Sequence, residues 1–401
     1  MSNSIFDPID DVIEAFRAGE MVVVSDDEGR ENEGDLICSA EKVTPEIINF
    51  MITHAKGLVC VPITQDRAKQ LGLRRMNASH EGDKYQTAFT VSVDAANSTT
   101  GISASERADT IKVLVDDNAQ PDDLLCPGHI FPLIAMDGGV LERPGHTEAT
   151  IDLNRMAGLK PAGVICEITN PDGSMARMPE LIEFAKEHGL KMTSVAEIIR
   201  HRYLSEKLVE RERTVPMPTE CGEFRLSLFT SSVDDKPHLA LVCGEPTEDK
   251  PHPLVRVHSE CLTGDVFGSL RCDCGPQMKT AMKMVQDYGY GAVVYMRQEG
   301  RGIGLAKKLH AYELQDQGLD TVEANEHLGF DADLRDYGIG AQILKDLGMD
   351  KIRLLTNNPA KIEGLDKYGI EVVERVEIIH DACEHNVRYL STKKEKMRHL
   401  L

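Results

Sequence analysis

Cys261, Cys272 and Cys274 are the residues whose types and spacing most directly indicate chemistry in this chain. Thiolates bind zinc tightly, and three protein ligands leave the fourth tetrahedral position to a water molecule or a substrate oxygen. Zinc acidifies such a water and polarises such an oxygen. The spacing therefore predicts a catalytic zinc site, and the basic, hydroxyl-bearing segment 256–260 just before it is a candidate substrate contact.

A structural zinc is the alternative interpretation of the same thiols. Its fourth ligand would come from elsewhere in the chain, either from Cys243 or from one of the 14 histidines. The acidic N-terminus lacks the apolar segment of a secretion signal, so the ten cysteines favour reduced thiols and metal binding over disulfides. We therefore expect a cytoplasmic or otherwise reducing compartment.

The length of 401 residues predicts two or three domains, and a hydrophobic content of 41% predicts globular cores. Aromatic residues make up 5% of the chain and the formal net charge is −21, which argues against a nucleic acid partner. The apolar runs are too short to span a bilayer, so we expect no membrane partner. Small phosphorylated substrates remain compatible, because a few arginines suffice to bind them.

An acidic segment, residues 26–35, follows the predicted buried strand 21–24. A solvated acidic turn is one interpretation of this pattern. Two embedded residues favour a functional loop instead, because Arg30 can pair with carboxylates and Gly34 permits a close backbone approach. Loops that directly follow strands often carry binding and catalytic groups.

Two histidines, His129 and His146, each follow a Pro-Gly pair in similar predicted turns. A single histidine is commonly structural, but two of them downstream of an acidic segment suit a hard divalent cation with few protein ligands. Glu167 ends a predicted strand, which is a suitable place for a catalytic acid or base. The hydroxyl-rich segment 98–104, before a predicted helix, is a candidate phosphate site.

In the second half, the predicted buried strand 291–296 leads into the glycine-rich, basic loop 297–304. Backbone N–H groups at a helix start, together with arginines, suit a polyphosphate. The glycine spacing matches neither a P-loop nor a dinucleotide fingerprint. Segments 333–335 and 356–361 add a carboxylate, a guanidinium, a hydroxyl and an amine, which would each be ordinary surface groups in isolation.

A charged segment between the halves predicts the domain boundary. A capping box at residues 194–197 starts a predicted helix that runs through segment 200–213. A helix that is polar on most faces often bridges two domains. We therefore place the boundary between about 201 and 215, with Pro216 and Pro218 marking the end of this region, and the domains at 1–205 and 206–401.

Contiguous motifs in both halves resemble two enzyme families. In the first half, segments 27–35, 127–132, 143–148 and 161–167 resemble 3,4-dihydroxy-2-butanone 4-phosphate synthase. In the second half, segments 256–265, 270–275, 297–301, 314–318 and 354–359 resemble GTP cyclohydrolase II. Together they cover nearly the whole chain, in the order found in bifunctional riboflavin biosynthesis enzymes.

The resemblance implies an α/β (α+β) fold class with two fused mixed α/β domains. The N-terminal domain would be an α/β sandwich, and the C-terminal domain would be a zinc-containing α+β domain. Members of the family are dimers, so the resemblance also implies a homodimer, in which the N-terminal site borrows residues across an interface.

In the first half, the resemblance implies conversion of D-ribulose 5-phosphate to 3,4-dihydroxy-2-butanone 4-phosphate and formate. A rearrangement through enediols needs a divalent cation that holds adjacent oxygens, and groups that move protons around them. The resemblance assigns magnesium or manganese to Glu31 and His146, and proton transfer to His129 and Glu167. The implied contacts to ribulose 5-phosphate are Arg30, Glu31, Asp35, Arg143, Pro144, Gly145, His146, Thr147 and Glu167.

In the second half, the resemblance implies that GTP loses a ring carbon as formate and also releases diphosphate, leaving 2,5-diamino-6-hydroxy-4-(5-phosphoribosylamino)pyrimidine. Zinc held by Cys261, Cys272 and Cys274 would activate water, Asp333 would be the general base and Tyr312 would lie near it. Arg335 is assigned as a nucleophile toward the α-phosphorus, although a guanidinium that stays protonated equally suits a phosphate clamp. The implied GTP contacts are Arg256, Val257, His258, Ser259, Glu260, Gln277, Glu299, Gly300, Arg301, Thr321, Thr356 and Lys361.

Two positions depart from the synthase pattern. Gly29 replaces an expected aspartate, and Cys126 replaces an arginine that many members carry before Pro127. Neither change removes an implied ligand, but the loss of a cation near His129 makes the synthase half the weaker of the two. Two alternatives to a bifunctional enzyme therefore stay open: an enzyme with one active half and one scaffold half, or a zinc-stabilised GTP-binding regulatory protein.

Overall fold

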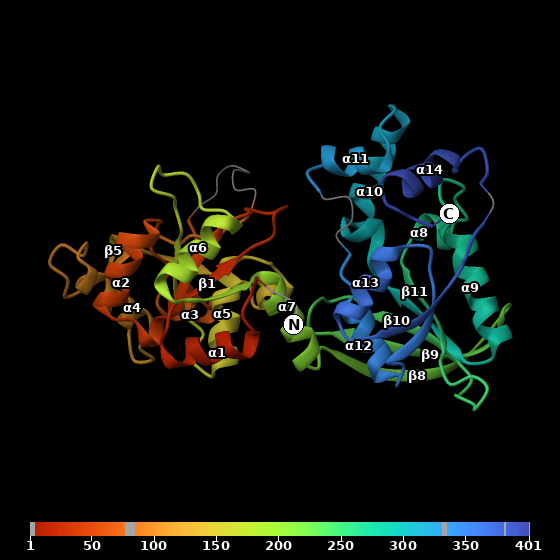
Figure 1. The fold of residues 1–401 in the computed structure, drawn as a ribbon, viewed down its shortest axis with the longest axis horizontal. Coiled ribbons are helices and arrows are strands. Elements are labelled where there is room, and N and C mark those ends of the chain that lie inside the picture. Colours follow the sequence, from red (N-terminus) through yellow and green to blue (C-terminus); the bar gives the residue numbers. More distant parts are fainter. Residues whose placement is uncertain (1–4, 77–84, 331–334, 381, 401) are drawn as a thin grey trace. The chain divides into compact units, whose positions relative to one another are not determined.

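The structure of the protein is a computed structural model that describes residues 5–76, 85–330, 335–380 and 382–400. Its contacts divide the chain into two compact units, Met1–Arg202 and Tyr203–Leu401 (Figure 1). Each unit contains one seven-stranded sheet with helices around it. The predicted domain division after residue 205 falls at the end of helix α7, whereas the contacts divide the chain within this helix.

The sheet of the first unit has the strand order β4-β5-β3-β6-β2-β1-β7. The strands are β1 (Val22–Ser25), β2 (Gly34–Ser39), β3 (Cys60–Ile63), β4 (Val93–Ala95), β5 (Leu124–Ile134), β6 (Gly163–Glu167) and β7 (Lys191–Ser194). The helices are α1 (Ile9–Ala18), α2 (Pro45–Phe50), α3 (Gln65–Gln70), α4 (Ala104–Val115), α5 (His146–Ala157), α6 (Met178–His188) and α7 (Val195–Ser205).

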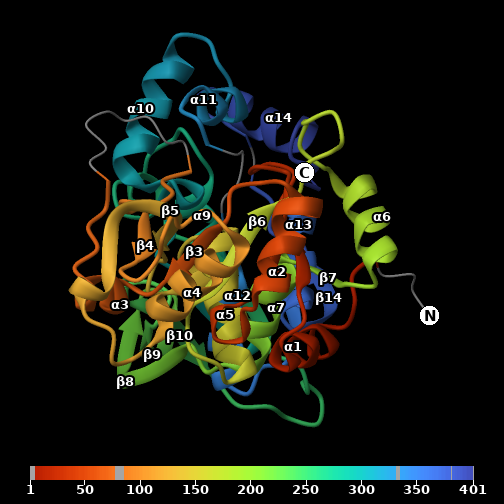
Figure 2. The same cartoon turned by 90° about the vertical axis from the view of Figure 1, so that its left-hand side faces the viewer.

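Side chains that alternate along the strands build a core on each face of this sheet. Val23 and Leu36 point into one core, which also holds apolar residues of α2, α4 and α6. Their neighbours Val24 and Ile37 point into the other core, together with residues of α1, α5 and α7. Because successive strand residues face opposite sides, continuous apolar runs predict a sheet covered on both faces. The expected α/β sandwich is confirmed, and its helices can be followed in Figure 2.

The sheet of the second unit has the strand order β14-β13-β11-β12-β10-β9-β8. The strands are β8 (Val209–Thr219), β9 (Gly222–Ser231), β10 (His238–Cys243), β11 (Leu254–Ser259), β12 (Gly291–Met296), β13 (Lys351–Leu355) and β14 (Glu371–Val376). The helices are α8 (Leu262–Asp265), α9 (Cys274–Tyr288), α10 (Gly304–Asp316), α11 (Thr321–His327), α12 (Gly338–Asp346), α13 (Pro359–Lys367) and α14 (Val387–Glu395).

Strands β11, β12 and β13 of this sheet run parallel, so the loops that follow them meet at one edge. Ala281 and Val285 of α9 cover one face of the sheet in a core with Val293. A separate small cluster, which includes Leu314 and Ala324, holds α10 against α11. The mixed α/β architecture expected for the second half is confirmed.

The predicted helix through segment 200–213 was wrong in its second part. Helix α7 ends at Ser205, and the charged residues from Glu210 to Arg213 belong to β8, which pairs with β9 at the edge of the sheet. An edge strand exposes many of its side chains to water and tolerates proline, which accounts for both its charges and for Pro216 and Pro218. High charge density therefore indicated an exposed strand here and not a bridging helix.

All ten cysteines have free thiols. None of the helices in the described ranges has the length and apolar character needed to cross a membrane.

Candidate active sites

The loop between β1 and β2 is organised around the buried carboxylate of Asp26. Its oxygens accept the backbone N–H groups of Glu31 at 3.1 Å and Glu33 at 2.8 Å, and Oδ2 pairs with Arg30 Nη1 at 2.9 Å. These contacts fold the acidic loop back on itself and bring the Glu31 side chain to the start of α5. The interpretation of a solvated turn therefore does not apply to Asp26 and Glu31.

Asp26, Glu31 and His146 bring ligand atoms within 4.8 Å of one another. Nδ1 of His146 lies 3.6 Å from Glu31 Oε2 and 3.8 Å from Asp35 Oδ1. The buried atoms His146 Nε2 and Asp35 Oδ1 have no hydrogen-bond partner among the described residues. Carboxylate oxygens and an imidazole nitrogen suit Mg²⁺ or Mn²⁺, and a bound ion would satisfy buried polar atoms of this kind. The residues therefore fit the divalent cation that the sequence implied.

His146 and its acidic neighbours shift one another's protonation. Burial disfavours the imidazolium, but the Asp35 and Glu31 carboxylates raise the pKa of His146 to about 9. Burial raises the pKa of Asp35 to about 7, although His146 opposes this shift. Burial thus favours the neutral form of the Asp35 carboxyl group. It stands directly opposite Glu167 in the pairing of β2 with β6.

Two guanidinium groups converge on Gly145, the residue that precedes α5. A Cβ atom on Gly145 would lie 2.6 Å from Arg143 Nη1 and 2.9 Å from Arg30 Nη2. Tyr85 holds both arginines, because its ring faces the Arg30 guanidinium and its carbonyl accepts Arg143 Nε at 3.0 Å. Helix α5 has no side-chain cap at its start. Helix N–H groups beside two arginines form an arrangement that suits a phosphate.

His129 and Glu167 take separate places in the first unit. His129 Nδ1 lies 2.8 Å from Asp94 Oδ2, and the backbone N–H of His129 donates to Asp94 Oδ1 at 2.8 Å, so Asp94 fixes the ring. Within the described part of the chain, His129 makes no hydrogen bond or ion pair with His146 or Glu167. Its side chain is 41% exposed. Glu167 Oε2 instead accepts the backbone N–H of Leu58 at 2.8 Å.

The hydroxyl-rich segment 98–104 does not form the predicted phosphate site. The Glu106 carboxylate accepts the backbone N–H groups of Thr99 at 2.7 Å and Thr100 at 3.1 Å, and the Ser103 hydroxyl at 2.8 Å. An internal carboxylate thus satisfies the groups that were expected to bind a phosphate. The prediction was wrong because the start of the following helix supplies its own anion.

A pocket in the second unit opens where β11, β12 and β13 end. Most of the residues assigned from the sequence to zinc or GTP line it, namely Arg256, His258, Ser259, Glu260, Cys261, Cys272, Cys274, Gln277, Glu299, Gly300, Arg301, Tyr312, Thr321, Arg335, Thr356 and Lys361. The Val257 side chain is buried in the core, and its carbonyl accepts Lys361 Nζ at 2.7 Å. Asp333, the expected general base, lies outside the described residues.

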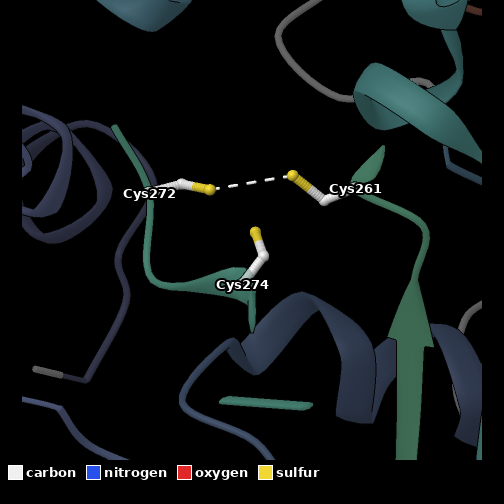
Figure 3. Close-up of side chains that lie close together, drawn as sticks. All are labelled: Cys261, Cys272 and Cys274. Atoms are coloured by element: carbon white, nitrogen blue, oxygen red, sulfur yellow. Dashed lines mark hydrogen bonds between the residues drawn. The ribbon is translucent and has the colours of Figure 1, made fainter. Parts of the chain in front are cut away.

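The three thiols meet at one wall of this pocket (Figure 3). Their sulfur atoms lie within 4.8 Å of one another, and Cys261 Sγ is 3.7 Å from Cys272 Sγ. A Cβ atom on Gly264 would lie 2.9 Å from Cys272 Sγ and 3.1 Å from Cys261 Sγ, so glycine keeps the space between them open. Hydrogen bonds from the Cys272 and Cys274 thiols, aided by Lys308, lower the pKa of Cys261. Three sulfur ligands of this kind fit a zinc ion.

Cys243 does not belong to this group. It is buried on β10 in the core with Val285, and its thiol donates to the Val285 carbonyl at 3.5 Å. In the described ranges, the group of possible metal ligands around Cys261 comprises the three thiols alone. This arrangement favours a zinc with a fourth position open to the pocket over a structural zinc completed by Cys243.

Lys308 connects the thiols to the loop after β12. Its Nζ atom lies 3.1 Å from Cys261 Sγ, 3.1 Å from Thr263 Oγ1 and 2.8 Å from Glu299 Oε1. The Tyr312 hydroxyl is 3.3 Å from Thr263 Oγ1. Burial opposes the charge on Lys308, but Glu299 and Cys261 raise its pKa. The sequence motifs pointed to Glu299 and Tyr312 but not to Lys308. The one feature that could have indicated a role for Lys308 is its position four residues before Tyr312, which puts both on the same helix face.

Buried hydrogen bonds connect the segment 256–260 to α9. Arg256 Nη2 donates to Gln277 Oε1 at 2.7 Å, and Gln277 Nε2 donates to Asp273 Oδ2 at 2.7 Å. His258 Nε2 lies 3.1 Å from both carboxylate oxygens of Asp265, and burial lowers the pKa of His258. Asp273 is thus tied to two of the proposed GTP contacts although it was not assigned from the sequence.

Three further lining residues come from the end of the chain: Tyr389, Lys393 and His399. The sequence contained no motif that pointed to them, because their place in the pocket depends on how the last segment returns to the sheet.

Comparisons with known proteins agree with this arrangement. The 3,4-dihydroxy-2-butanone 4-phosphate synthase family profile matches residues 10–201, and the GTP cyclohydrolase II family profile matches residues 210–377. The chain is 57% identical over 397 residues to riboflavin biosynthesis protein RibBA of Bacillus cereus, covering 99% of this chain and all of that protein. It is 55% identical to RibBA of Bacillus subtilis with the same coverage.

A further relative is RibBA of Synechocystis, which is 56% identical over 401 residues, covering 99% of this chain and 72% of that protein. Among solved structures, RibBX of A. baumannii is described as a two-domain 3,4-dihydroxy-2-butanone 4-phosphate synthase. It aligns with a TM-score of 0.72 and 40% identity, covering 93% of this chain and all of that one.

Proposed function

The chain belongs to the bifunctional riboflavin biosynthesis family, with a 3,4-dihydroxy-2-butanone 4-phosphate synthase followed by a GTP cyclohydrolase II, and from this premise we propose which residues perform each reaction. The observation that supports the assignment best is the position of three thiols in the wall of a pocket that also carries most of the proposed GTP contacts.

In the synthase unit, Glu31 and His146 hold the magnesium or manganese ion, and Asp26 is a third ligand or orients Glu31. The ion would polarise substrate oxygens and so make the neighbouring O–H and C–H groups more acidic. Arg30, Arg143 and the first N–H groups of α5 bind the phosphate. This places the carbon chain of ribulose 5-phosphate toward the cluster of carboxylates.

Proton transfer in this unit falls to Glu167 and His129. Glu167 keeps one oxygen, Oε1, for the substrate because Leu58 N–H occupies Oε2. Asp35, whose pKa burial raises to about 7, receives and returns a proton beside Glu167. Asp94 orients the His129 ring through Nδ1, which leaves Nε2 as the atom that exchanges a proton.

In the cyclohydrolase unit, Cys261, Cys272 and Cys274 hold zinc. The ion would supply an activated water for attack on the imidazole carbon of guanine. Lys308 keeps Cys261 as a thiolate and anchors Glu299, whose second oxygen accepts the Leu262 N–H at 2.7 Å. These contacts fix the loop that presents Cys261 to the pocket.

The nucleotide is held by the basic groups of the same pocket. Arg301 and Arg335 clamp the phosphates, and Arg335 acts through its permanent charge and not as a nucleophile. Gly300 and Arg301 both adopt a left-handed backbone conformation, with φ of 63° and 60°, which turns the loop after β12 into the pocket. Asp333, two residues before Arg335 in the sequence, is proposed as the general base.

We test the assignment by measuring formate release from ribulose 5-phosphate and from GTP, with metal analysis of the same protein. Cys274→Ser should abolish zinc binding and formate release from GTP while sparing the synthase reaction. His129→Ala should abolish formate release from ribulose 5-phosphate while sparing zinc binding and formate release from GTP. A protein that binds GTP and zinc but releases no diphosphate would support the regulatory alternative. Activity on one substrate alone would indicate that the other half is a scaffold.

Two properties of the whole molecule are also proposed. The exposed side chain of His129 is compatible with a homodimer in which a second copy covers it, and sedimentation of the purified protein tests that state. A cytoplasmic location would keep the zinc-binding thiols reduced. Fractionation of the cells that make the protein tests that location.

A further inference from the structure

The last part of the chain forms one wall of the nucleotide pocket. The cyclohydrolase profile match ends at residue 377, whereas helix α14 and the residues after it span 387–400. Helix α14 lies next to α11 in the second unit (Figure 1). Tyr389, Lys393 and His399 from this segment line the pocket together with the thiols. The segment, called here the C-terminal brace (residues 387–400), is therefore part of the site that the motifs of the family define.

The first contact of the C-terminal brace reaches the segment 272–274, called here the zinc loop because it carries two of the proposed zinc ligands. Lys393 Nζ lies 2.7 Å from Asp273 Oδ1, and both residues are buried. Asp273 stands between two of the proposed zinc ligands, Cys272 and Cys274, and its other oxygen accepts Gln277 Nε2 at 2.7 Å. A buried carboxylate without its cation is strongly unfavourable, and here it would also lie between two thiolates. Lys393 therefore fixes the direction of the Asp273 side chain.

The second and third contacts reach two other walls of the pocket. Lys396 Nζ pairs with Asp320 and lies 2.9 Å from Glu323 Oε1, at the start of α11 where Thr321 lines the pocket. The backbone N–H of Leu400 donates to the Asn357 carbonyl at 2.8 Å, beside Thr356. Each contact thus lies next to a residue that is proposed to bind zinc or GTP.

We propose that the C-terminal brace is part of the cyclohydrolase site, and that Lys393 is a positioning residue that holds the Cys272–Cys274 loop through Asp273. This proposal rests on the assignment of zinc to the three thiols. The brace acts through three separated loops, since it contacts the zinc loop, the start of α11 and the loop after β13. Substitution of residues that orient metal ligands in this way typically lowers metal affinity by about 10-fold to 100-fold.

The deciding experiment uses the full-length protein with Lys393→Met, Lys393→Arg and the control Lys394→Met. Lys394 is exposed on the same helix. The first readout is zinc retention against a competing chelator, and the second is kcat and KM for formate release from GTP. Lys393→Met should retain zinc at least about tenfold less tightly and turn over GTP more slowly. Lys393→Arg should recover most of both properties, and Lys394→Met should match the parent protein.

The synthase reaction of the same chain serves as the internal reference and should not change in any variant. If Lys393→Met retains zinc and processes GTP as the parent does, the proposal is overturned. If Lys393→Met does not fold, the double variant Lys393→Met with Asp273→Asn removes the isolated charge. Weak zinc retention in that folded variant supports the proposal, and retention equal to the parent overturns it. A parent protein that lacks zinc altogether would instead refute the assignment of the thiols.

Discussion

The Nζ atom of Lys308 lies 3.1 Å from the Sγ atom of Cys261, and the same ammonium pairs with Glu299 at 2.8 Å. One cation thus stabilises a thiolate and a buried carboxylate at once. Removal of its charge leaves Glu299 without its cationic partner and raises the pKa of the Cys261 thiol, so the loop that carries Cys261 is less firmly held.

We expect Lys308→Met to lower kcat/KM for GTP by at least about 100-fold and to weaken zinc binding at neutral pH. The control is Lys307→Met, because Lys307 is the exposed neighbour on the same helix. Steady-state formate release and zinc titration measure the two effects. Equal behaviour of the two variants would contradict the role of Lys308.

The carboxylate of Glu31 is predicted to be a metal ligand of the synthase unit. Glu31→Gln removes its negative charge but keeps its shape, so the variant should bind Mn²⁺ at least about 100-fold more weakly. The rate of formate release from ribulose 5-phosphate should fall as well, because the variant holds less metal. Glu28→Gln is the matched control, because Glu28 is exposed in the same loop. Calorimetric titration with Mn²⁺ distinguishes the variants, and unchanged affinity in Glu31→Gln would exclude Glu31 as a ligand.

Gly145 is predicted to keep the phosphate position open. In Gly145→Ala the added methyl group would lie 2.6 Å from Arg143 Nη1 and 2.9 Å from Arg30 Nη2, so one guanidinium must move. We expect kcat/KM for ribulose 5-phosphate to fall by about tenfold or more, mainly through KM, because the phosphate anchor is displaced. The GTP reaction of the same protein should not change. A loss in kcat with unchanged KM would argue against phosphate binding at this position.

The attachment of the C-terminal brace is predicted to weaken in acid. Burial, together with Lys393, Arg335, Arg301 and Lys361, lowers the pKa of His399 to about 3. A detached segment would return this pKa to the ordinary value of about 6.5. The attached segment therefore binds fewer protons than the detached one. The free energy that favours attachment is fully present above about pH 6.5 and decreases as the pH falls below that value.

Between pH 7.5 and pH 5.5 the population of detached segments should rise by about tenfold. Hydrogen-exchange protection factors of the amides in the C-terminal brace, corrected for the intrinsic exchange rate at each pH, measure this change. His399→Gln should remove the pH dependence, whereas the exposed control His385→Gln should retain it. A protection factor that does not change with pH in the parent protein would contradict the buried, neutral state of His399.

Short-range patterns in the sequence identified much of the fold and of both sites. The continuous apolar run at residues 21–24 predicts a buried strand, because a strand with apolar residues on both faces needs a partner on each side of its sheet. The Cys272–Cys274 spacing predicts a metal loop, because two thiols on one short loop must project near each other. Such inferences succeed where neighbours in sequence are also neighbours in space.

The same reasoning failed where the composition of a segment was compatible with two structures. The charged residues after Ser205 resembled a bridging helix, but pairing with β9 makes them an edge strand. The hydroxyls of segment 98–104 resembled a phosphate site until Glu106 occupied their donors. In both cases a contact with the next element along the chain, β9 or the start of α4, selected one of the two structures.

The sequence by itself determined which chemical groups the protein carries and which of them adjoin along the chain: the thiols near Cys261, the acidic loop at Glu31 and the histidine turns. Only the tertiary structure decided that Lys308 faces Cys261, that Asp26 folds the acidic loop onto His146, and that Lys393 reaches Asp273 from the end of the chain. The physical reason is that a buried charge is stable only beside its counterion. Which counterion it meets depends on how the strands of one sheet bring remote segments to a common edge.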